Sequence, residues 1–120
     1  MIPQRIQLSR AKGWRMPTDT VKVDRSTYFG NPFPVDCYGQ ERAVDLFRRW
    51  MTGNMSSREM SGLTRSDRWS GHRELSLVTV RQFIRDDLHK LAGKNLACWC
   101  KIGSPCHADV LLAIVNGGEA

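Results

Sequence analysis

Three of the four cysteines and one of the three histidines fall within ten positions near the carboxyl end of the chain: Cys98, Cys100, Cys106 and His107. Thiols and imidazoles can ligate metals, attack electrophiles and move protons near neutral pH. The residues from Leu96 to Cys100 predict a buried strand, in which Cys98 and Cys100 point to the same face. The chemistry of this short stretch is therefore the first question that the sequence raises.

A turn and a helix are expected to follow this strand. Ser104 is a good N-cap and Pro105 suits the first helical position, which predicts a helix over residues 105–115. Cys106 and His107 then lie in the first turn, beside backbone amides that have no intrahelical partner. α/β proteins place anion sites and reactive groups where a strand ends beside a helix N-terminus.

Three interpretations of this stretch stay open. In the first, Cys98, Cys100, Cys106 and His107 ligate zinc, although their spacing differs from the paired cysteines usual in zinc sites. In the second, the stretch is a catalytic and ligand-binding site. In the third, Cys98 and Cys100 fill the core and His107 bonds a backbone carbonyl. The basic surface would then bind nucleic acid or a protein partner without catalysis.

The catalytic interpretation assigns a role to each polar side chain of the stretch. Cys106 is the reactive thiol, because free helix amides and the nearby Lys101 favour its thiolate. His107 donates or accepts the proton, and Asp109 orients it. Lys101 and Ser104 are expected to contact the ligand.

Two earlier loops supply further candidate ligand-binding residues. Arg25 follows a predicted strand, Gly30 allows close backbone approach or a positive φ, and Asn31 is held extended by the proline after it. Alternatively, Asn31 only bonds its own loop. We expect this loop to meet the cysteine stretch in one pocket, with Trp14 or Tyr28 as its aromatic wall.

The remaining pattern predicts a small α/β fold. Short strands are expected at 5–8 and 21–23, an amphipathic helix at 41–51, and a second helix capped by Thr79 that ends before Gly93. With the strand and helix already described, they form a short central sheet flanked by about three helices. Residues 54–74 lose periodicity and contain Trp69 and His72; they predict a flexible insertion or a lid over an anionic ligand.

Composition limits the classes of function. A chain of 120 residues is long enough for one domain, expected to span residues 1–120, and its net charge of +6 favours a nucleic acid or a small anionic partner. Its apolar runs are too short to span a membrane, and it begins without a signal-peptide pattern. We therefore expect a cytoplasmic protein with free thiols.

Several separated motifs recur in the order of a known family: Lys12-Gly13-Trp14-Arg15-Met16-Pro17, Phe29-Gly30-Asn31-Pro32-Phe33, Ala97-Cys98-Trp99-Cys100 and Pro105-Cys106-His107-Ala108-Asp109-Val110. The chain resembles domain of unknown function 4326, a family of actinobacteria and their phages, over nearly its whole length. The resemblance implies the host cytoplasm if the chain is phage-encoded, and it supplies no activity. The sequence favours a domain that binds and acts on a nucleotide-like or other phosphate-bearing small molecule at a Cys/His helix N-terminus. The alternative is a zinc-stabilised or metal-free nucleic-acid-binding or protein-interaction module.

Overall fold

Three short strands form a parallel sheet in the computed structural model, which describes residues 3–66, 69 and 75–117. They are β1 (Arg5–Gln7), β2 (Thr20–Lys22) and β3 (Asn95–Cys98), in the order β1-β3-β2. Leu96, Ala97 and Cys98 are buried, as expected for a central parallel strand covered on both faces. The last strand of the chain therefore lies between the first two, and all three carboxyl ends meet at one edge of the sheet.

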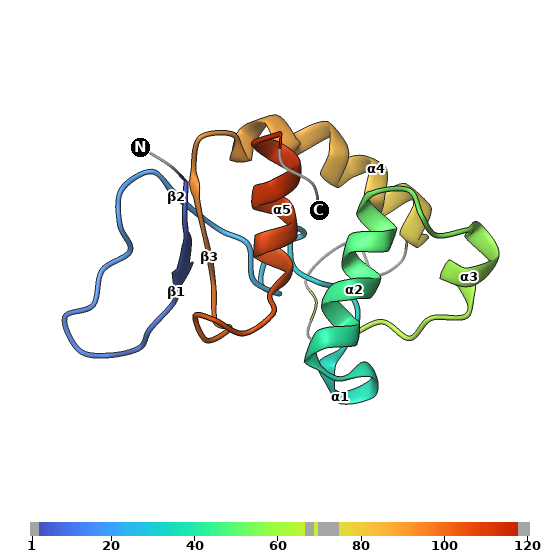
Figure 1. Cartoon of the computed structure of the whole chain (residues 1–120), viewed down its shortest axis with the longest axis horizontal. Helices are drawn as coiled ribbons and strands as arrows, with labels where there is room; N and C mark the ends of the chain where they lie inside the picture. Colours follow the sequence, from blue (N-terminus) through green and yellow to red (C-terminus); the bar gives the residue numbers. More distant parts are fainter. Residues whose placement is uncertain (1–2, 67–68, 70–74, 118–120) are drawn as a thin grey trace.

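Helices follow or separate these strands: α1 (Val35–Tyr38), α2 (Gln40–Met51), α3 (Ser57–Ser61), α4 (Leu77–Asp87) with the 3₁₀ turn η1 (Leu88–Leu91), and α5 (His107–Val115). In Figure 1 the sheet, α5 and α2 lie in that order across the molecule, and α4 lies along the upper side. The predicted small α/β fold is confirmed. α1 and α3, each of five residues or fewer, are the helices that the sequence pattern did not predict.

The core lies between α2, α4 and α5. α2 contributes Ala43, Val44, Phe47 and Trp50, all buried, on the stripe predicted from helical periodicity. The Trp50 indole N–H donates to the Leu77 carbonyl at 3.1 Å, so this core side chain also bonds a backbone group at the start of α4.

Two predicted helix starts are wrong, each by two or three residues. α4 begins after Ser76 rather than Thr79, because the Ser76 hydroxyl accepts the Thr79 amide hydrogen and forms the cap. α5 begins at His107, because Cys106 has an extended backbone and its carbonyl accepts the Asp109 amide hydrogen. Cys106, in an extended conformation, is therefore the N-cap residue in place of Ser104.

The predicted flexible insertion at 54–74 contains ordered contacts where the structure describes it. Ser56 caps α3 by accepting the Glu59 amide hydrogen, and Met55, Met60 and Trp69 are buried against the core. Residues 67–68 and 70–74, which include His72, lie outside the described residues. Flexibility of the segment, a lid role and a single domain over 1–120 stay predictions.

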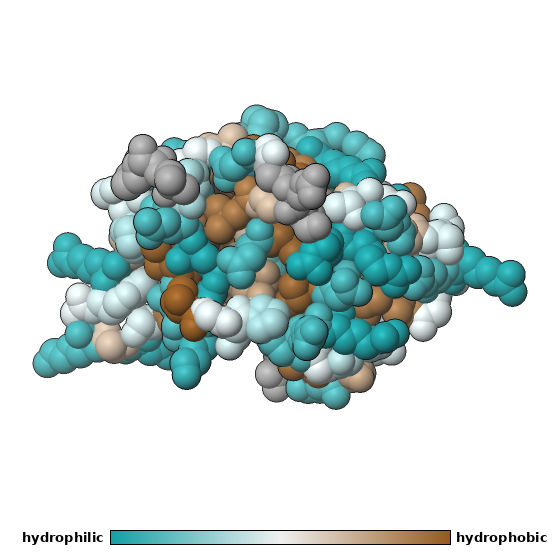
Figure 2. All heavy atoms as spheres, viewed as in Figure 1, coloured by the Kyte–Doolittle hydropathy of each residue, from teal (hydrophilic) through white to brown (hydrophobic). Residues whose placement is uncertain are grey.

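The face of the molecule in Figure 2 is largely hydrophilic, with apolar side chains visible between the polar ones. Among the described residues, no helix has the length and apolar character needed to cross a bilayer.

Candidate functional site

A pocket of about 360 Å³ opens at the carboxyl edge of the sheet. Each strand contributes to its lining: Arg10 comes from the segment after β1, Arg25 from the segment after β2, and Trp99 and Cys100 from the residues directly after β3. His107, the first residue of α5, completes this set. We call this hollow the strand-end pocket. Open parallel sheets place their ligands at this edge.

Asp24 fixes one wall of the strand-end pocket. Its carboxylate accepts hydrogen bonds from the Ser26 hydroxyl at 2.5 Å and from the Trp99 indole at 2.8 Å, and the Lys22 ammonium lies 3.7 Å away. Burial raises the pKa of Asp24, but these donors and the lysine charge outweigh burial and hold the pKa below its ordinary value. The ionised carboxylate thus ties the loop after β2 to the indole after β3.

Two arginines line the strand-end pocket in different ways. The Arg25 guanidinium donates to the Asn31 and Phe33 carbonyls, both at 3.2 Å, and this fixes its position. Among the described residues, no hydrogen bond occupies its Nη1 atom. The Arg10 guanidinium lies over the Trp99 ring, 4.5 Å from the ring centroid. Cation–π contact of this kind holds an exposed arginine beside the pocket.

The loop that carries Arg25 depends on Gly30 and Asn31. A Cβ atom on Gly30 would lie 2.5 Å from the Asp24 carbonyl oxygen and 2.6 Å from the Arg25 Cα. The predicted close backbone approach is confirmed, and the glycine has no positive φ. The Asn31 side chain donates to the Ala43 carbonyl of α2 and accepts from the Phe33 amide of its own loop, and it also lines the strand-end pocket. A role of Asn31 in ligand binding stays a prediction.

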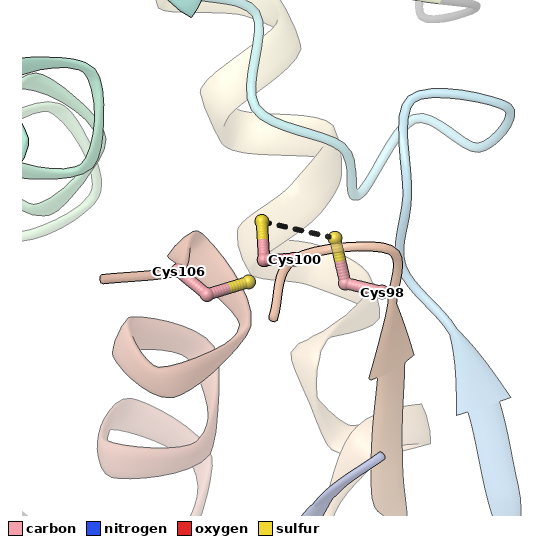
Figure 3. A group of neighbouring side chains, drawn as sticks. All are labelled: Cys98, Cys100 and Cys106. Atoms are coloured by element: carbon pink, nitrogen blue, oxygen red, sulfur yellow. Dashed lines mark hydrogen bonds between the residues drawn. The ribbon is translucent and has the colours of Figure 1, made fainter. Parts of the chain in front are cut away.

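The three cysteines of the carboxyl-terminal stretch meet, although they come from two elements and the turn between them. Figure 3 shows Cys98 at the end of β3, Cys100 in the turn after it and Cys106 at the start of α5, with their sulfur atoms gathered together. The three Sγ atoms all lie within 4.8 Å of one another, and those of Cys98 and Cys100 are 3.8 Å apart. The fourth cysteine, Cys37, is exposed and lies outside this cluster.

The three thiols do not ionise alike. Hydrogen bonding from Cys106 and then from Cys98 lowers the pKa of Cys100, and Gln40 adds a donor 3.5 Å from its sulfur. The interaction with Cys100 raises the pKa values of Cys98 and Cys106, and burial raises both as well. Cys100, half-buried and facing the strand-end pocket, is the thiol that ionises first.

His107 is buried, and its ring is held by the backbone. Nε2 lies 2.6 Å from the Val23 carbonyl oxygen, which can only accept, so Nε2 carries the proton. Burial lowers the pKa of His107 and keeps the imidazole neutral. Nδ1 therefore has a lone pair, 3.9 Å from the Cys106 sulfur.

The other residues predicted for the catalytic stretch lie away from the strand-end pocket. Asp109 is exposed and lines a separate hollow with Ser104, and its Oδ1 is 3.9 Å from Arg5 Nε. Lys101 is exposed in the turn before α5. Cys106 is buried among the sulfurs and is not a lining residue. The structure therefore separates Asp109 from the pocket that His107 lines.

The aromatic side chain that lines the strand-end pocket is not one of the two that the sequence predicted. Tyr28 stacks on Phe29, and its hydroxyl donates to Asp87 beside another hollow. Trp14 is half-buried in the loop between β1 and β2. Neither ring lines the strand-end pocket; Trp99 does.

Sequence reasoning left Trp99 and Asp24 out of the candidate site. A signal for Trp99 was present, because it stands between two thiols in a short motif, but strand alternation predicted that it faces away from them. β3 ends at Cys98, so this alternation does not extend to Trp99. Asp24, next to Arg25, had no comparable signal, since its role depends on an indole 75 residues away.

Fold and site together define a class: a small parallel α/β domain with three clustered thiols and two arginines at the carboxyl edge of its sheet. The chain belongs to the family described as Domain of unknown function (DUF4326), which matches residues 6–117. This agrees with the resemblance seen in the motifs.

A relative in Enterobacteria phage T4 is described as "Uncharacterized 12.4 kDa protein in nrdA-td intergenic region". It is 27% identical to this chain over 96 residues, which cover 80% of the chain and 67% of the relative. The expected relationship to phage proteins is confirmed, and occurrence in actinobacteria stays a prediction. No solved structure matches the chain.

Proposed function

We propose that the chain binds a nucleotide-like, phosphate-bearing small molecule in the strand-end pocket and acts on it there. The observation that carries this proposal is the convergence of Arg10, Arg25, Trp99 and Cys100 from the ends of three parallel strands. The cavity of about 360 Å³ falls within the roughly 300–1,000 Å³ typical of small-molecule sites.

The two arginines support a phosphate ligand. Arg25 is held by two carbonyl oxygens, so little side-chain entropy remains to be lost when its Nη1 atom, which has no hydrogen bond to the described residues, binds an anion. Arg10 brings a second positive charge to the same pocket. The Asp24 carboxylate also lines the pocket, but Ser26, Trp99 and Lys22 surround its oxygens and reduce its repulsion of an anion.

Trp99 supports a ligand that also has a flat ring. Its side chain is 40% exposed, which is high for a tryptophan, and the Asp24 carboxylate fixes the indole through its N–H group. An exposed, immobilised indole can stack on a base, with Arg10 over the ring as the adaptable partner.

The test uses calorimetry on the full chain at low salt, with the common nucleoside monophosphates, the matching nucleosides and inorganic phosphate as probes. A monophosphate should bind more tightly than its nucleoside. Arg10→Ala should weaken that binding by about 10- to 100-fold, since a charge-assisted hydrogen bond is worth roughly 1.5–3 kcal/mol. Arg58→Ala removes an exposed arginine of α3, outside the pocket, and should leave affinity unchanged.

Equal affinities of the Arg10→Ala and Arg58→Ala variants would contradict the assigned phosphate contact. If no monophosphate binds at millimolar concentration, the proposal is overturned.

A second candidate, nucleic-acid binding, rests on the segment between β1 and β2. This segment extends away from the helices in Figure 1 and carries Arg10, Lys12 and Arg15, all exposed. Duplex binding through these residues should lose affinity with a log-log salt slope of about −0.9 per phosphate contacted. A shallow slope, or binding equal in a Lys12→Ala, Arg15→Ala double variant, would exclude this interface.

A further inference from the structure

We propose that Cys98, Cys100 and Cys106 bind one Zn²⁺ ion whose fourth coordination position faces the strand-end pocket. The three Sγ atoms lie within 4.8 Å of one another and approach a common point from β3, the following turn and the start of α5 (Figure 3). Thiols are soft ligands, and an all-sulfur set of this kind selects zinc over harder cations such as magnesium.

The spacing of the sulfurs fits tetrahedral zinc. With Zn–S bonds of about 2.3 Å, neighbouring thiolates of a tetrahedral ion lie about 3.8 Å apart. The Sγ atoms of Cys98 and Cys100 have this separation, at 3.8 Å. The Cys106 Sγ lies within 4.8 Å of both, so a shift of an ångström or less brings it to the same separation from each. Core packing alone would not require three thiols of different elements to point at one another.

The fourth position opens toward the pocket because two of the three ligands, Cys98 and Cys100, line it, whereas Cys106 lies behind them. His107 was the expected fourth ligand. Its Nδ1 lies 3.9 Å from Cys106, but His107 is not part of the group of mutually close ligand atoms. Three protein ligands with an open fourth position are the arrangement of catalytic zinc, whereas structural zinc has four.

A metal in this position would lie at the same hollow as Arg10 and Arg25. An oxygen of an anionic ligand, or a water molecule, would then occupy its fourth position. This consequence rests on the proposed function, whereas the metal site itself does not.

The first experiment measures zinc content by mass spectrometry after the full chain is equilibrated with zinc and dialysed. We expect one zinc per wild-type chain and per Cys37→Ser chain, because Cys37 is exposed and lies outside the cluster. Cys100→Ser is the decisive variant, since Cys100 is the least buried of the three and its loss threatens folding least. It should bind zinc at least tenfold more weakly while its circular dichroism stays native.

A wild-type chain without zinc, or a folded Cys100→Ser chain with wild-type affinity, overturns the site. The coordination shell is tested separately by X-ray absorption of the zinc-loaded wild-type chain, which needs no variant to fold. Three sulfurs and one oxygen are expected. Three sulfurs and one imidazole would show that His107 closes the site, and would overturn the open fourth position.

Discussion

Replacing Gly30 by alanine should damage the fold and the strand-end pocket together. The added Cβ would lie 2.5 Å from the Asp24 carbonyl oxygen, 2.6 Å from the Arg25 Cα and 2.8 Å from the Asp24 carbonyl carbon. All three are backbone atoms, so no side chain can rotate away. The Asp24 oxygen alone must move by about 0.5 Å to reach 3.0 Å, below which real Cβ contacts are essentially absent.

The cost follows from what holds those atoms in place. Arg25 is bonded to the Asn31 and Phe33 carbonyls, and Asp24 to Ser26 and Trp99, so the segment cannot shift without breaking some of these bonds. Overpacking typically costs about 1–3 kcal/mol, and we expect the upper half of that range here. For a chain of this length, a loss of about 2–3 kcal/mol lowers the Tm by roughly 6–15 °C.

Urea denaturation and thermal melting of Gly30→Ala measure this loss, with Gly62→Ala as the matched control. Gly62 has a negative φ, and its added Cβ would meet only the Glu59 carbonyl oxygen at 3.6 Å, an ordinary contact. The control should stay within about 0.5 kcal/mol of wild type. Gly30→Ala with the stability of Gly62→Ala would refute the reasoning.

Further predictions concern the polar contacts around the pocket and α4. Trp99→Phe keeps a ring but loses the donor to Asp24, and urea denaturation should show a loss of about 1 kcal/mol, below the usual value for a charged acceptor because the indole is exposed. The lowered pKa of Asp24 means that its ionised form stabilises the fold. The stability advantage of wild type over Asp24→Asn should be constant above about pH 5 and shrink as the pH falls below about 4; an advantage independent of pH would contradict the assignment. Burial, together with Asp87, raises the pKa of Tyr28 to about 12. Phenolate absorbance should show a tyrosine that ionises near this value and is missing from Tyr28→Phe, and Asp87→Asn should lower its pKa.

Much of the fold could be predicted from local pattern. The buried stripe of α2 appears in the sequence as apolar residues three and four apart, and the apolar run at 96–98 indicates the central strand. The first residues of the helices were harder to predict, because Ser76, Thr79 and Ser104 are all acceptable N-cap residues by type. The extended backbone of Cys106 sets the start of α5, and that conformation depends on the turn before it, not on the residue type.

The candidate site was only partly predictable. The sequence singled out Cys98, Cys100, Cys106, His107 and Arg25 as candidates by residue type, and the first four are close in the chain and so stay close in space. It could not show that Asn31 bonds Ala43, or that Asp109 lies beside Arg5, since both partners are distant in the chain. The type of a side chain determines which hydrogen bonds it can form. Only the neighbours packed around it determine which of its donors and acceptors remain available to a ligand.

The sequence by itself determined the identity of the chemical groups, because three thiols and an imidazole within ten positions are a property of the chain. Tertiary structure decided which of them share a pocket. The parallel order β1-β3-β2 brings residues that follow β1 and β2 beside residues that follow β3, more than 70 positions later. Arg10 and Asp24 reach Trp99 for this reason alone. Local propensity sets each strand, but hydrogen bonds between strands set the register, and the register places the strand ends together.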